Sequence, residues 1–269
     1  MMMNMIPSIW DEHKAFFPSI GKLARVEVKK TYQGTIFGML WIIMKPMVTL
    51  AAFYFVFAFG IRSGSPVKGI DHFDFLLAGF VAWFFMQDAI LGGVHCLRKH
   101  RAFVVQVKFP VSTIMTITMV ARLYVHMFLL CLALLYLLWK GWGDASWLQL
   151  LYYTPMMVLF FLVLSWTTSF LAAYSKDFEN TVQAGIQGLF WISGILWDTY
   201  GMKDAYLRFL MLWNPVNYFA NGYRKSLLYH EGIFSQPVET AVFFLEFAVL
   251  CIVGRYVYRR MRPTVPDVL

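Results

Sequence analysis

Long apolar stretches recur along the chain and are separated by short polar segments. A helix that crosses the hydrocarbon core of a bilayer needs roughly 17–25 residues. The pattern predicts an all-α integral membrane protein with six transmembrane helices, of which the fifth is the shortest. The six stretches that reach the required length are residues 36–61, 73–97, 111–139, 147–174, 181–197 and 238–258.

The segment before the first apolar stretch has a different pattern. Residues 9–31 carry apolar residues at helical spacing, with lysines and arginines among them. A basic amphipathic helix of this kind usually lies in the membrane interface. We therefore expect residues 1–35 to form a cytoplasmic interface helix, 36–260 a transmembrane domain and 261–269 a cytoplasmic tail. The interface helix is either a plain membrane anchor or a helix that lines a gate or contacts a partner.

Residues 198–237, between the fifth and sixth stretches, are not an ordinary loop. They contain two apolar, aromatic runs, 205–213 and 216–229, on either side of Asn214-Pro215. Each run is too short to cross the bilayer, so the two predict a re-entrant helix pair that packs against protein or a wet cavity. A short span joined to such a break is typical of a translocation region.

Composition narrows the class of protein. Of the 269 residues, 59% are hydrophobic and 14% are charged, whereas a soluble domain has roughly 45–50% and 25%. This difference excludes a disordered chain, a disulfide-rich secreted module and an ordinary soluble enzyme. The net charge of +8 indicates either nucleic-acid binding or cytoplasmic loop charge. If the N-terminus is inside, the cytoplasmic segments hold twice as many Lys and Arg residues as the outer loops, so we expect both termini inside and no nucleic-acid partner.

Sequence signatures of catalysis are missing. A phosphate-binding P-loop requires G-x-x-x-x-G-K-[ST], and the Gly21-Lys22 pair lacks the first glycine of that motif. The sequence contains no H-E-x-x-H, paired-cysteine or G-x-S-x-G motif. We therefore expect a chain that is not an enzyme by itself and binds no metal or cofactor. Any ATP and Mg²⁺ that it uses would be bound by a partner subunit.

Three ionisable residues within the predicted spans attract attention: Asp88, Arg122 and His126. Charges inside a membrane are costly and usually functional. Arg122 and His126 are four residues apart, so they share a helix face. The three residues form either a proton relay, as in a proton-coupled secondary carrier, or a structural Asp–Arg pair with His126 hydrogen-bonded nearby.

The short loop 98–110 is basic at its start and apolar in its middle, and a proline precedes the third span. Either its basic residues only keep this loop on the cytoplasmic side, or the loop forms a short helix that inserts into a partner subunit. The residues expected to make that contact are Arg98, Lys99, Arg101, Phe103, Lys108 and Pro110.

Aromatic residues make up 19% of the chain. Many of them are expected in belts at the two membrane interfaces. Gly34 and Gly38 form a G-x-x-x-G pattern, which would allow close helix packing. The candidates for an aromatic path along which sugar rings slide are Trp83, Phe84, Phe85, Trp191 and Trp197.

Several short motifs occur in a fixed order: R-x(6)-Y-x-G-x(3)-G-x(2)-W-x(4)-P, FLLAGFVAWFF, VKFP, KDF, Asn-Pro and Gly-Tyr-Arg. Together they resemble the ABC-2 type permeases that export O-antigen, capsule and teichoic-acid polymers. The segment NPVNYFANGYRKSLLY is most similar to the teichoic-acid translocation permeases. The chain departs from these relatives at Gly194, where a proline is common, and at Lys45, where a neutral residue is common. The matching residues are Arg25, Tyr32, Gly34, Gly38, Trp41, Pro46, Asn214, Pro215 and Arg224.

The resemblance implies the permease subunit of an ATP-driven exporter in a bacterial cytoplasmic membrane. Its substrate would be a polysaccharide on an undecaprenyl diphosphate carrier, with wall teichoic acid as the specific polymer. Its partners would be a second copy of the chain and two nucleotide-binding ATPase subunits, which dock at the coupling loop 98–110. An entrance for the diphosphate is expected at the cations Lys22, Arg25, Lys29 and Lys30.

Three rival functions stay open at the level of sequence. The first is an ABC-2 permease for a small lipid or a drug, and the second is the proton-coupled carrier. The third is a membrane-embedded transferase, which the missing catalytic motifs disfavour.

Overall fold

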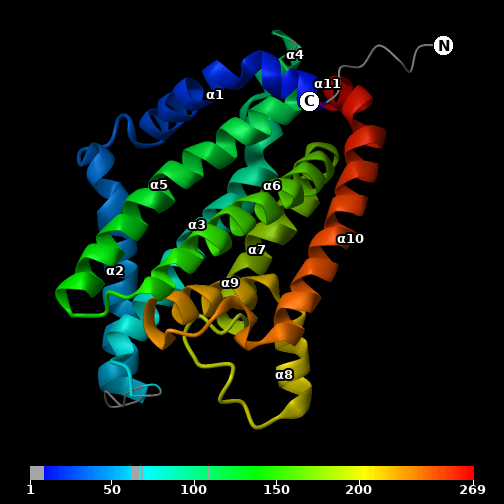
Figure 1. Cartoon of the computed structure of the whole chain (residues 1–269). Coiled ribbons are helices and arrows are strands. Elements are labelled where there is room, and N and C mark those ends of the chain that lie inside the picture. The colour runs from blue at the N-terminus through cyan, green and yellow to red at the C-terminus, as the bar shows by residue number, and fades with distance from the viewer. Residues whose placement is uncertain (1–8, 62–66, 68, 108) are drawn as a thin grey trace.

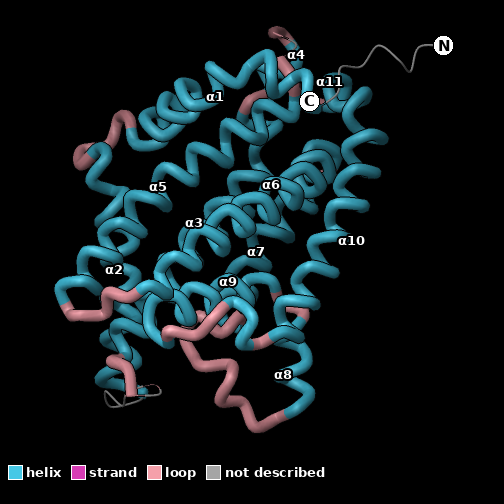
Figure 2. Tube along the Cα trace, viewed as in Figure 1, coloured by secondary structure: helices cyan, strands magenta, loops and turns pink. Residues whose placement is uncertain are grey.

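The computed structural model describes residues 9–61, 67, 69–107 and 109–269. In these residues the regular structure is entirely helical, which confirms the predicted all-α membrane fold (Figure 2). The long helices are α1 (Ile9–Tyr32), α2 (Trp41–Phe55), α3 (His72–Lys99), α5 (Val111–Trp139), α6 (Leu150–Tyr174), α7 (Lys176–Ile192) and α10 (Pro237–Met261). The short ones are η1 (Gly38–Leu40), η2 (Val56–Ile61), α4 (Arg101–Val105), η3 (Ala145–Gln149), α8 (Ala205–Leu212), α9 (Pro215–Arg224), η4 (Lys225–Tyr229), η5 (Ile233–Ser235), η6 (Arg262–Thr264) and α11 (Val265–Val268).

Five stretches of the described chain are long and apolar enough to cross a membrane. They correspond to predicted spans one to four and six, and they run Gly38–Gly60, His72–Lys99, Val111–Trp139, Ala145–Tyr174 and Pro237–Val268.

The fifth predicted span, residues 181–197, differs in the structure. The helix at this position, α7, begins earlier, at Lys176, and ends at Ile192 after 17 residues. At 1.5 Å per residue it is about 26 Å long, slightly shorter than a bilayer core. It ends there because Gly194 adopts a positive φ of 65°, which glycine tolerates and most other residues do not. The total of six spans stays a prediction.

The helix α3 lies at the centre of the bundle and packs against α5, α6, α7 and α9 (Figure 1). Small residues allow its close approach to α6. A Cβ atom added to Gly93 would lie 2.3 Å from Oγ and 3.2 Å from Cα of Ser165. Because a backbone atom limits the space, only glycine fits at this crossing. The helix at the centre of the bundle thus has glycine where it crosses α6.

The amphipathic helix α1 is docked on the bundle. Figure 1 shows it lying across the end of the bundle that also holds α11, beside α5. Its residues Ile20 and Ala24 pack against Ile117 and Ala121 of α5. The apolar face that the sequence assigns to a membrane interface is therefore covered in part by protein.

The first turn of α1 is also fixed by polar contacts. Glu12 is buried, accepts a hydrogen bond from Ser112 of α5 and forms an ion pair with Arg262 after α10. A buried carboxylate is stable only when donors surround it. These contacts join the beginning and the end of the chain.

The opposite end of the bundle holds α8 and α9 (Figure 1). The break between them lies at Asn214-Pro215, as the sequence pattern indicates. Asn214 caps α9 by accepting from the backbone N–H groups of Val216 (3.0 Å) and Asn217 (3.3 Å), and Pro215 occupies the first helical position. The residues of α9 are buried, whereas α8 has no buried residue. Whether the pair dips into a membrane stays a prediction.

Candidate functional site

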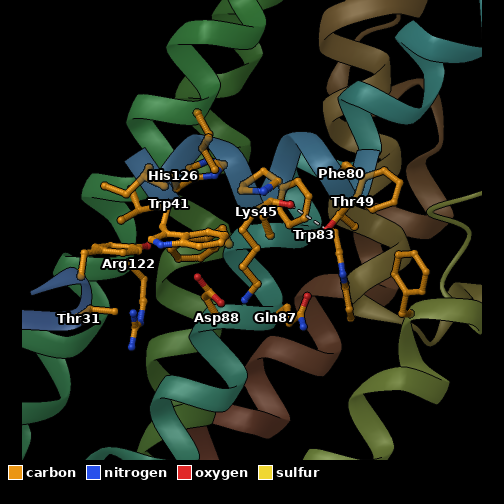
Figure 3. Close-up of a pocket in the computed structure, with 18 of the residues that line it drawn as sticks. Thr31, Trp41, Lys45, Thr49, Phe80, Trp83, Gln87, Asp88, Arg122 and His126 are labelled. Atoms are coloured by element: carbon orange, nitrogen blue, oxygen red, sulfur yellow. Dashed lines mark hydrogen bonds between the residues drawn. The ribbon is translucent and has the colours of Figure 1, made fainter. Parts of the chain in front are cut away.

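A cavity of about 590 Å³ opens between α1, α2, α3, α5 and α7. Its volume lies within the roughly 300–1,000 Å³ of ligand sites. Figure 3 shows its polar and aromatic side chains directed toward a common space. Its polar and aromatic lining includes Tyr32, Trp41, Lys45, Trp83, Gln87, Asp88, Arg122, His126, Gln187 and Trp191.

Three charged residues line this cavity: Lys45, Asp88 and Arg122. In Figure 3 the end of Lys45 points between Asp88 and Gln87, and Arg122 lies on the other side of Asp88. Among the residues that the structure describes, Asp88 forms no ion pair with either cation. The Nε atom of Arg122 is buried and has no hydrogen-bond partner. The structural Asp88–Arg122 pair that we considered from the sequence is therefore wrong: both residues face an open cavity instead.

His126 lines the same cavity but is engaged elsewhere. Its Nε2 atom shares a hydrogen bond of 2.8 Å with the Tyr223 hydroxyl, which shares another of 2.7 Å with Oγ1 of Thr154. No hydrogen bond in the described structure links His126 to Asp88 or Arg122. In the described structure the three residues are therefore not joined by direct hydrogen bonds, and a proton relay among them stays a prediction.

Four of the five aromatic residues proposed as a sugar path line the cavity: Trp83, Phe84, Phe85 and Trp191. Trp197 is not part of the lining, because it lies beyond the end of α7 and its indole donates to the carbonyl of Trp191 at 3.1 Å. Sequence proximity to Trp191 placed it in the candidate path, but the turn at Gly194 separates the two ring positions. Whether any of these rings contacts substrate stays a prediction.

The residues near the start of the chain that match the permease motif fall into two groups. Tyr32, Trp41 and Pro46 line the cavity. Gly34 and Gly38 lie in the turn between α1 and α2 with positive φ angles of 85° and 50°, and no atom lies within 4 Å of a Cβ added to either. The suggested close helix packing at G-x-x-x-G is wrong, because these glycines serve backbone conformation.

The four cations proposed as a substrate entrance all lie exposed on α1: Lys22, Arg25, Lys29 and Lys30. Arg25 borders a second, apolar groove of about 570 Å³ between η1, α2 and α5. This groove shares Ile42 and Val125 with the first cavity. An apolar groove thus lies beside a charged cavity, and exposed cations lie nearby.

The coupling loop contains the short helix α4, and its residues divide into two groups. Arg98 belongs to the fold: its Nε atom lies 3.2 Å from Glu179 of α7 and donates to the carbonyl of Ala172 at 2.9 Å. Arg101 and Phe103 on α4 are exposed, Phe103 by 42%. Pro110 precedes α5 as its N-cap residue. The remaining two candidates are Lys99, which is ion-paired, and Lys108, which lies outside the described residues.

The coupling loop is joined to α1 through Glu27, a residue that the sequence reasoning missed. Glu27 is buried, forms an ion pair with Lys99 and lies 3.4 Å from His100. The hydrogen bond with His100 lowers the pKa of Glu27 to about 2 against the opposing effect of burial. Burial lowers the pKa of His100, but hydrogen bonds with Cys96 and Glu27 outweigh it and raise that pKa to about 10. The sequence does contain a signal, because Glu27 follows Ile20 and Ala24 on the apolar face of α1.

Arg224, at the end of α9, is fully buried. Its guanidinium donates to the carbonyls of Gly194 (2.7 Å), Ile195 (2.5 Å) and Phe75 (3.4 Å), and it lies 3.7 Å from the centre of the Phe75 ring. The first two carbonyls follow the C-terminus of α7, where the helix dipole favours a cation. Arg224 therefore holds α9, α3 and the end of α7 together.

The cavity offers binding chemistry, with two cations, one carboxylate, amides and aromatic rings. In the described part of the chain, no group of three or more His, Cys, Asp or Glu residues could hold a metal ion.

The chain is similar in sequence to known proteins. Residues 19–228 match the sequence model of the ABC-2 type transporter family. Two O-antigen export system permease proteins RfbA from Klebsiella pneumoniae are 21% and 20% identical to the chain over 248 residues. Each alignment covers 90% of this chain and 92% of the relative.

Proposed function

The chain belongs to the ABC-2 type transporter family, and from this premise we propose that it is the permease subunit of an ATP-driven polysaccharide exporter. The cavity with Lys45, Asp88 and Arg122 beside aromatic rings carries the proposal, because a sugar polymer needs both polar and aromatic contacts. The similarity to two O-antigen export permeases over nearly their whole length supports the substrate class.

The exporter contains two copies of the chain, with a pore between them. The support comes from α7, whose Ile186 and Phe190 are buried while its other face is exposed. That exposed face carries Asn180, Gln183 and Gln187, and polar side chains do not face lipid at membrane depth. A water-filled pore or a second copy would cover them, and closed two-fold symmetry is the simplest arrangement.

The ATPase subunits dock against the coupling loop. The exposed Arg101 and Phe103 on α4 supply a cation and an apolar ring for that contact. The helices α1, α4 and α11 lie at the same end of the bundle (Figure 1), and in our proposal this end faces the cytoplasm, as the distribution of Lys and Arg favours. Closure of the ATPase pair then moves α4 and the helices joined to it as a rigid body.

The substrate is carried on undecaprenyl diphosphate. Lys22, Arg25, Lys29 and Lys30 on α1 attract the diphosphate, and the neighbouring apolar groove takes part of the polyprenyl tail. The specific polymer we propose is wall teichoic acid, a choice that rests on the resemblance of residues 214–229 to teichoic-acid permeases.

Co-purification with candidate ATPase subunits tests the proposal. We expect no ATPase activity from the permease alone, and ATP hydrolysis by the complex that rises when lipid-linked polysaccharide is added. Stimulation by small lipids or drugs but not by polysaccharide would favour the rival ABC-2 function. Uptake driven by a pH gradient without ATP would favour the secondary carrier and would contradict the proposal.

A further inference from the structure

The charged cavity extends from the end of α1, at Tyr32, to membrane depth. Measured along the helix axis, Lys45 lies about 10 Å after Gly38, where the first span begins. Asp88 and Arg122 each lie about 16 Å along their helices from the ends of α3 and α5 that flank the coupling loop. These positions approach the middle of a hydrocarbon core roughly 30 Å thick. Unpaired charges at that depth are functional by default.

The cavity carries one positive charge in excess. Lys45 and Arg122 are cations, and Asp88 is the only carboxylate among the lining residues. Neither cation is ion-paired in the described structure, and Nε of Arg122 has a proton to donate with no acceptor. A single anionic group would satisfy both cations and restore neutrality.

The uncharged residues of the cavity lining favour a ligand that contains a sugar ring. Trp41, Trp83 and Trp191 present aromatic surface, and Gln87 and Gln187 present amides that can bond hydroxyl groups. A site that combines aromatic faces with a few convergent polar groups binds an amphipathic ligand. A sugar ring has such character, since its faces carry C–H groups and its edges carry hydroxyls.

We propose that Lys45 and Arg122 bind the acidic group of a sugar unit in transit, so that the exporter takes an anionic glycan. The proposal rests on the polysaccharide function given above and adds the two residues that bind the anionic groups of the polymer, whether it is wall teichoic acid or another acidic glycan. The diphosphate of the carrier fits less well, because it carries two or more negative charges and no ring. The four exposed cations of α1 match the diphosphate better.

Calorimetric titration of the permease–ATPase complex in nanodiscs tests the proposal with three soluble probes. Trigalacturonate supplies carboxylated rings, maltotriose supplies the same number of neutral rings, and geranyl diphosphate supplies the carrier's charged group. We expect trigalacturonate to bind about tenfold more tightly than maltotriose, the effect of one charge-assisted hydrogen bond. Lys45→Gln and Arg122→Gln remove this preference, and Lys45→Arg retains it.

Matched variants separate this site from the rest of the protein. Lys203→Gln, the same change at an exposed lysine, leaves the preference unchanged. Loss of trigalacturonate binding in Lys22→Gln but not in Lys45→Gln would overturn the proposal, since the anion would then bind on α1. Parallel loss of geranyl diphosphate binding in Lys45→Gln would also overturn it, in favour of the carrier group.

The result also separates this inference from the proposed function. If lipid-linked polysaccharide stimulates ATP hydrolysis but trigalacturonate and maltotriose bind equally, only the preference for an anionic glycan is wrong. If polysaccharide gives no stimulation, the proposed export function itself fails.

Discussion

Nε2 of His100 lies 3.4 Å from Oε2 of Glu27, although 73 residues separate them in the chain. The contact joins the amphipathic helix α1 to the residue between α3 and α4. Lys99 binds the other oxygen of the same carboxylate. A carboxylate held by two cations is a strong, directional link. If the 98–110 loop moves, as the proposed function requires, this link would move α1 with it.

Glu27→Gln weakens this link, because Lys99 and His100 contact the two different carboxylate oxygens, and the amide has only one accepting oxygen and no charge. We expect a loss of about 1–3 kcal/mol in unfolding free energy, the range for hydrogen bonds to charged groups. The measurement is the thermal unfolding midpoint of the purified permease in detergent. Asp267→Asn is the control, since Asp267 is exposed near the end of the chain. Equal midpoints for Glu27→Gln and wild type would contradict the link.

The same pair predicts a dependence of stability on pH. The pKa of His100 is raised to about 10, so its contribution is complete below the unfolded value near 6.5 and is lost as the pH rises toward 10. The pKa of Glu27 is lowered to about 2, so its contribution is complete above about 4.3 and is lost as the pH falls toward 2. The stability difference between wild type and His100→Gln should shrink from pH 6.5 to pH 10. A difference that stays constant over this range would refute the assignment.

Arg224→Lys tests the buried junction at the other end of the molecule. A lysine lacks the planar fork that reaches the Gly194 and Ile195 carbonyls together. We expect a loss of at least about 2 kcal/mol, which lowers the unfolding midpoint by about 4–8 °C. The control is Arg208→Lys on α8, because Arg208 is exposed. An equally small shift in both variants would show that the fork is not needed.

Gly93→Ala tests the crossing of α3 and α6. The added methyl group meets Cα of Ser165 at 3.2 Å and its side chain more closely, so overpacking should cost about 1–3 kcal/mol. Gly185→Ala on α7 is the matched control, because nothing lies within 4 Å of the Cβ position there. Thermal unfolding of both variants checks the prediction, which fails if Gly93→Ala is as stable as Gly185→Ala.

Arg101→Glu tests docking of the ATPase at α4. Because Arg101 is exposed, its reversal should lower ATPase co-purification severalfold and leave the unfolding midpoint unchanged. Arg98→Glu is a poorer test, since Arg98 contacts Glu179 and Ala172 and its reversal disturbs the fold as well. Undiminished co-purification of Arg101→Glu would exclude this residue from the contact.

The sequence could predict much of the fold and less of the candidate site. The apolar stretches located five spans because hydrophobic length is a local property of the chain. The end of α7 was misplaced because Gly194 ends the helix although apolar residues continue to Trp197. Of the candidate aromatic path, Trp83 and Trp191 do line the cavity, while Trp197 does not.

The sequence by itself determined a helical membrane protein with a basic amphipathic N-terminus, an Asn-Pro helix start and the motifs of its family. These features depend on residue type and on spacing within one helix. Only the tertiary structure decided that Lys45, Asp88 and Arg122 line one cavity without pairing, and that Glu27 joins α1 to the coupling loop. Whether two charged side chains pair depends on the distance between them. That distance is set by how helices far apart in the chain pack together, which the spacing of residues within one helix does not reveal.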